Sequence, residues 1–137
     1  MSCEYHIDVT RRCVFTRCWG DLTDEDLLGH QRSITADPRF EPTMSQCMDY
    51  RDVVQVSLTT EGVRALAVRS SFDARARRAF LMNRLVLKGL ARMYQVIANV
   101  TDDALRICES REEAFEWVGL DLSAAWPEGK PDWSSEG

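Results

Sequence analysis

The sequence contains no long hydrophobic run and few residues that interrupt regular structure. Its 137 residues include seven glycines and four prolines, and its apolar runs are a few residues long, far short of the ~20 that cross a bilayer. The N-terminus has charges at Glu4 and Asp8, where a secretory signal would have an apolar stretch. We therefore expect a soluble, cytoplasmic protein with no integral membrane association. A chain of this length is enough to bury the core of one domain.

Motifs for metal, cofactor and covalent chemistry are also missing. The five cysteines include no C-x-x-C pair, so their spacing does not fit a zinc site, and no glycine-rich loop is present that would cradle a phosphate. The two histidines, His6 and His30, form no evident set with a nucleophile. We expect no metal, no cofactor and no catalytic activity. The cysteines are interpreted as small buried hydrophobic residues, although Cys3, near the chain end, leaves a reactive thiol as an alternative.

Strand and helix patterns alternate along the chain. Residues 4–10 alternate polar and apolar side chains, and residues 12–19 are apolar on both faces, so both segments are expected strands. The element order β-β-α-β-α-β-α-β-α predicts an α/β fold with a mixed, mostly parallel five-stranded sheet and about four helices. The other expected elements are strands at 44–50, 78–82 and 105–108, and helices between Thr23 and Asp37, at 60–70, at 86–99 and between Ser110 and Gly119.

Local signals define several ends of these elements. Thr23 and Asp26 have the spacing of a capping box at a helix start. Asp37-Pro38 is expected to end that helix, because the residue before proline is displaced from helical conformation. Gly20 is expected to end the second strand, and residues 53–58 are interpreted as a loop.

Five short segments follow one another in the order of a known family pattern. They are Gly20–Asp26 (GDLTDED), Ala36–Phe40 (ADPRF), Met48–Arg51 (MDYR), Gly89–Tyr94 (GLARMY) and Glu113–Val118 (EAFEWV). Together they resemble the motifs G-x-L-T-x-E-D, D-P-R-F, D-x-R, G-x-A-R-M-Y and E-A-x-x-W-L of the SpoIIAA-like (STAS/SEC14-type) family of the STAS superfamily. Gln46 and Cys47 depart from the aliphatic residues usual in the family's third strand.

This resemblance implies a STAS-like domain over residues 1–120, followed by a C-terminal tail over 121–137 that contains Trp126 and Trp133. It implies a non-enzymatic interaction or regulatory module that binds a protein partner or forms a homodimer. The alternative is a carrier of a small apolar, lipid-like ligand, with its pocket between the sheet and the second and third helices. Related regulators are phosphorylated on a serine at the start of the second helix. Ser57 is the candidate by position, without the family's motif, and capping of the helix is the alternative.

Polar residues cluster where the expected strands end and the next helices begin. In a parallel sheet, ligands bind outside the carboxyl ends of the strands, and this edge contains the candidate ligand- or partner-binding residues. They are Asp49, Arg51, Ser57, Arg84, Lys88 and Arg92. Asp49 could form a functional pair with Arg51 or Arg92, or a structural ion pair at the sheet edge.

The net charge of −5 is distributed unevenly along the sequence. Residues 69–92 contain seven basic residues and one acidic residue, whereas residues 101–137 contain ten acidic and three basic residues. The acidic average argues against a nucleic-acid partner. The two charged segments are either solvated faces or surfaces that pair between subunits or recruit an anionic partner.

Overall fold

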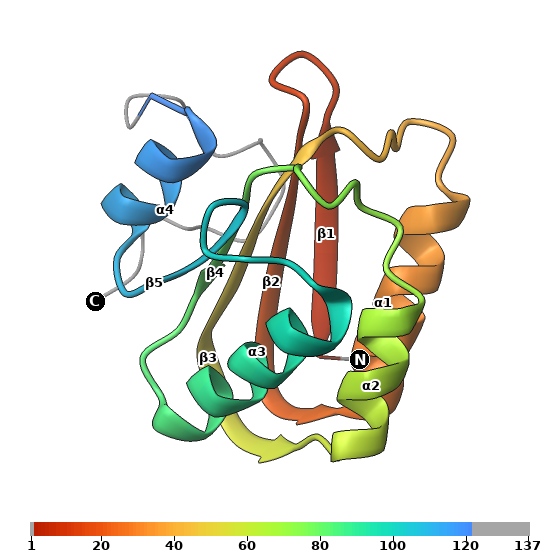
Figure 1. Cartoon of the computed structure of the whole chain (residues 1–137), viewed down its shortest axis with the longest axis vertical. Helices are drawn as coiled ribbons and strands as arrows, with labels where there is room; N and C mark the ends of the chain where they lie inside the picture. The colour runs from red at the N-terminus through yellow and green to blue at the C-terminus, as the bar shows by residue number, and fades with distance from the viewer. Residues whose placement is uncertain (1, 122–137) are drawn as a thin grey trace.

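The computed structural model describes residues 2–121 as one five-stranded sheet with four helices (Figure 1). The sheet order is β1-β2-β3-β4-β5, in which β1 and β2 are antiparallel and the later pairs are parallel. The elements are β1 (Cys3–Asp8), β2 (Cys13–Thr23), α1 (Asp24–Ala36), β3 (Ser45–Ser57), α2 (Thr60–Val68), β4 (Arg78–Leu81), α3 (Leu85–Ala98), β5 (Leu105–Cys108) and α4 (Arg111–Val118). The predicted fold class and element order are confirmed. The expected tail, with Trp126 and Trp133, lies outside the described residues beyond position 121.

The helices cover the two faces of the sheet unequally (Figure 1). On one face, Met48 and Phe80 of the strands pack against α1, α2 and α3. On the other face, Phe115 of α4 packs against Cys47 and Leu81. Because successive residues of a strand point to opposite faces, Cys47 and Met48 belong to different layers of the core.

The start and end of α1 follow from local hydrogen bonds. The Thr23 side chain accepts a hydrogen bond from the Asp26 backbone, and the Asp26 carboxylate accepts one from the Thr23 backbone, which confirms the predicted capping box. The helix ends at Ala36, and Asp37 is extended as its C-cap, as Pro38 requires. Of the helices in residues 2–121, none combines the length and hydrophobicity of a bilayer span.

Two predictions between β2 and β3 are wrong. Gly20 does not end β2; its positive φ of 66° lies at an irregularity in the register, after which the strand continues to Thr23. Residues 53–57 are not a loop, because β3 extends to Ser57 alongside β2. Val53, Val54 and Val56 favour a strand, and the backbone of this segment pairs with β2 as far as Ser57.

The cysteines are buried in both layers of the core. Cys13 and Cys18 contribute to different hydrophobic clusters, as expected for opposite faces of one strand. Cys3 lies in β1 opposite Cys18, and their sulfur atoms are 3.2 Å apart. The alternative of an accessible thiol at Cys3 is therefore wrong, because β1 pairs with β2 almost from the start of the chain.

Candidate ligand-binding site

Asp49 and Arg51 form a local ion pair at the end of the buried part of β3. The guanidinium donates to both carboxylate oxygens of Asp49, at 3.0 Å from Nε and 2.9 Å from Nη2. The Arg51 backbone N–H also donates to Asp49. Asp49 is thus hydrogen-bonded within its own strand, in the bidentate geometry that an arginine forms with a carboxylate.

The three basic candidates near α3 have separate partners. Arg84 donates from Nη1 to the backbone oxygens of Val53 and Val54, at 3.0 and 2.5 Å, and so ties the start of α3 to β3. One turn further, Lys88 pairs with Glu109 after β5. Arg92 pairs with Asp102 at 2.7 Å rather than with Asp49. The structure therefore does not bring these candidates together into one site.

Ser57 lies at the end of β3, where its hydroxyl donates to Asp21 at 2.7 Å. The cap of α2 is Thr59, which accepts from the Gly62 backbone. The Thr59 backbone and hydroxyl in turn donate to the carboxylate of Asp24, at 3.0 and 2.6 Å. The start of α2 thus already holds an internal anion, and a phosphate on Ser57 would lie close to Asp21.

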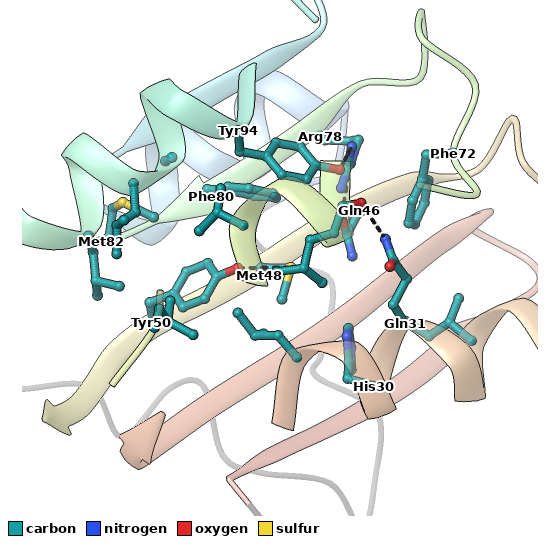
Figure 2. A pocket seen from close by; sticks show the side chains of 18 of the residues that line it. His30, Gln31, Gln46, Met48, Tyr50, Phe72, Arg78, Phe80, Met82 and Tyr94 are labelled. Atoms are coloured by element: carbon teal, nitrogen blue, oxygen red, sulfur yellow. Dashed lines mark hydrogen bonds between the residues drawn. The ribbon is translucent and has the colours of Figure 1, made fainter. Parts of the chain in front are cut away.

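A pocket lies between the sheet and the three helices of its larger layer (Figure 2). Its volume is about 70 Å³. The parallel register places Gln46 beside Arg78 and Met48 beside Phe80, so these four side chains form one surface of β3 and β4. The apolar lining residues are Leu27, Ile34, Met48, Tyr50, Leu58, Val63, Leu66, Phe72, Phe80, Met82, Leu87, Leu90, Ala91 and Tyr94.

The pocket has one polar end, formed around Arg78. Figure 2 shows Arg78 beside Tyr94 and Gln46, away from Met82. Arg78 is 5% exposed; its Nε donates to Gln46 Oε1 at 2.9 Å, and its Nη1 donates to the Tyr94 hydroxyl at 3.0 Å. The guanidinium carbon also lies 4.6 Å from the ring centre of Phe72. Aromatic faces attract a cation and offset part of its desolvation.

The imidazole of His30 lies in the wall that α1 contributes. Its Nε2 is 2.7 Å from Thr16 Oγ1. Burial of the ring, with a smaller contribution from the charge of Arg78, lowers the pKa of His30 to about 4. The ring is therefore neutral at pH 7. Of the lining residues, all within 2–121, Arg78 is then the one that has a charge at neutral pH.

Sequence reasoning missed Arg78, because it belongs to the basic segment 69–92 and was counted as surface charge. The signal was present in the period of the strand: Arg78, Phe80 and Met82 alternate with Ala79 and Leu81, so the arginine shares a face with large apolar residues. The pocket does lie where an apolar ligand was expected, between the sheet and the second and third helices, with α1 as an additional wall.

Comparisons with known proteins support the fold. No protein-family profile and no curated protein matches the sequence. The structure is similar to the crystal structure of an uncharacterized protein from the DUF3478 family, with a SpoIIAA-like fold, from Shewanella loihica PV-4. The two share 16% sequence identity with a TM-score of 0.57, over 85% of this chain and 94% of that chain.

The chain therefore has a SpoIIAA-like α/β fold, as its sequence motifs implied. The comparison gives no activity, because the similar protein is itself uncharacterized. Within residues 2–121, no group of three or more histidine, cysteine or acidic residues is arranged to hold a metal ion.

Proposed function

We propose that the protein binds a small, mainly apolar ligand in the pocket between the sheet and α1, α2 and α3. The observation that carries the proposal is a pocket of about 70 Å³ that is lined mainly by apolar side chains. Protein interiors are normally close-packed, so a pocket between the sheet and three helices is a place where an apolar group can be removed from water.

The size of the pocket limits the ligand. Typical sites for drug-sized molecules have volumes of ~300–1,000 Å³, so about 70 Å³ suits a short chain or a single ring rather than a whole long-chain lipid. The apolar lining favours such a group, because burial removes it from water without leaving a polar group unsatisfied.

The test is a titration with 1-hexanol, in which binding is measured from the NMR chemical shift of the Met48 methyl group. Met48 is one of the residues that line the pocket. Ala91→Leu fills the pocket from α3 and is expected to abolish binding. Val96→Leu on the exposed side of α3 is the matched control, and it should bind as the wild type does. Equal binding by wild type and Ala91→Leu would contradict the proposal.

A second candidate function is an interaction module that works as a homodimer. It is favoured by exposed apolar side chains at one end of the molecule: Val54 is 74% exposed and Leu85 86% exposed. Arg84 links the two segments through the Val54 backbone, so both lie at the same end. Sedimentation of the wild type as a dimer, shifted to monomer by Leu85→Ser, would support a second copy as the partner. A wild type that is monomeric both at high concentration and after 100-fold dilution would exclude the homodimer.

A further inference from the structure

The charge of Arg78 has no acidic partner among residues 2–121. Among residues 2–121, no carboxylate lies within ion-pair distance of its guanidinium, and its hydrogen bonds go to the uncharged oxygens of Gln46 and Tyr94. A charge buried without an opposite charge is costly. The three nearby rings of Phe72, Phe80 and Tyr94 lower this cost but do not neutralise the charge.

Part of the guanidinium is free to bind a ligand. An arginine side chain has five N–H donors, and Nη2 of Arg78 has no hydrogen-bond partner among the described residues. The residue as a whole is 5% exposed. Arg78 lines the pocket, so a ligand in the pocket would lie against a guanidinium that still has unused donors.

A second donor lies beside these nitrogens. The Tyr94 hydroxyl accepts a hydrogen bond from Arg78, so its own hydrogen remains available to another acceptor. Tyr94 and Arg78 come from different elements, α3 and β4, and both side chains point into the same end of the pocket (Figure 2). The neutral His30 nearby adds no competing charge.

We infer that the natural ligand of this pocket is an apolar carboxylic acid, whose carboxylate binds Arg78 and the Tyr94 hydroxyl while its chain lies among the apolar residues. The inference rests on the proposed function and adds the chemical class of the ligand. A carboxylate is planar, with two oxygens that match the fork of a guanidinium. Binding converts an isolated buried charge into a hydrogen-bonded ion pair, which favours the acid over any neutral molecule with the same chain.

The experiment compares sodium hexanoate with 1-hexanol at pH 7.5, using the Met48 methyl shift and calorimetry. In the wild type we expect hexanoate to bind roughly 10- to 100-fold more tightly, as charge-assisted hydrogen bonds predict. Arg78→Met should remove this preference and retain hexanol binding. The matched control is Arg77→Met: Arg77 is exposed and stacks over Trp117 outside the pocket, so the preference should persist.

Tyr94→Phe provides a second test that keeps the ring and removes only the hydroxyl; it should reduce the preference for hexanoate several-fold. Equal affinities of the wild type for hexanoate and hexanol would overturn the carboxylate inference and leave the proposed function intact. Binding of neither molecule would overturn both. Inorganic phosphate that binds as tightly as hexanoate would also overturn the inference, because the chain would then contribute nothing.

Discussion

The carboxylate of Asp24 lies in the space that a β-carbon at position 62 would occupy. Two donors from Thr59 hold the carboxylate in place, at 3.0 and 2.6 Å. Through this contact α1 and α2 are joined at their N-terminal ends. Glycine at position 62 is therefore required by the close approach and not by its backbone conformation.

Gly62→Ala should destabilise the protein, although alanine normally favours a helix by about 1 kcal/mol over glycine. The added methyl group displaces Asp24 from its hydrogen bonds, so we expect a net loss of about 1–3 kcal/mol in the free energy of unfolding. Urea denaturation measures it. Gly89→Ala is the control, because nothing lies within 4 Å of a β-carbon there, and it should stabilise. The explanation fails if both variants shift stability in the same direction.

The stability of the protein should fall between pH 6.5 and pH 4 because of His30. Its pKa in the folded state is about 4, below the ordinary value of 6.5, so the unfolded chain binds the proton first as the pH falls. The contribution is fully present above pH 6.5 and is lost as the pH drops towards 4; it amounts to about 3 kcal/mol at most. Denaturation at a series of pH values measures the slope.

His30→Gln should flatten the slope in this window, since glutamine cannot take up a proton. Below about pH 4, the variant should still lose stability. There Asp37, whose pKa is lowered chiefly by its hydrogen bonds with Arg39, becomes protonated in the unfolded chain. A variant with the wild-type slope between pH 6.5 and 4 would show that His30 is not responsible.

Asp49→Asn should affect stability and not ligand binding. Asp49 is buried, and its substitution leaves Arg51 without its bidentate partner, which we expect to cost about 1–3 kcal/mol. Asp102→Asn removes the carboxylate from an exposed pair with Arg92 and should cost less than about 1 kcal/mol. If Asp49→Asn lost 1-hexanol binding with its stability unchanged, the result would show that Asp49 contributes to ligand binding.

The thiols should react slowly in the native protein. All five cysteines are buried, and burial together with the neighbouring Cys3 raises the pKa of Cys18 well above its usual range. Since the thiolate is the reactive form, a thiol reagent at pH 8 should modify them only at the rate of unfolding. Full, rapid reaction in denaturant is the control. One fast-reacting thiol, assigned to Cys3 by peptide mass spectrometry, would contradict the buried β1 position.

Local signals in the sequence were sufficient for most of the fold. The capping box at Thr23 and the break at Pro38 depend on neighbouring residues, and both occur as expected. The extension of β3 to Ser57 has a local signal in Val53, Val54 and Val56, but the pairing that supports it comes from β2, more than 30 residues away. Whether such a segment forms a strand depends more on its partner than on its own propensity.

The candidate site was harder to predict than the fold. The sheet-edge rule selected charged residues such as Lys88 and Arg92, which the structure pairs with separate acids. Arg78 was indistinguishable by composition from its exposed neighbours Arg75 and Arg77. What distinguishes it is the period of the strand, which sets it on one face with Phe80 and Met82; its place beside Gln46 follows from the register of β3 and β4.

The polar end of the pocket, at Gln46 and Arg78, and its apolar wall come largely from different parts of the fold. Both residues belong to neighbouring central strands of the sheet, whereas much of the apolar wall comes from α1, α2 and α3. In the proposed complex, Arg78 of the sheet and Tyr94 of α3 hold the head of the ligand, whereas the room for its tail depends on the other lining side chains of the helices. Substitutions at those other helix positions should therefore change the chain length that is accepted and keep the preference for an acid.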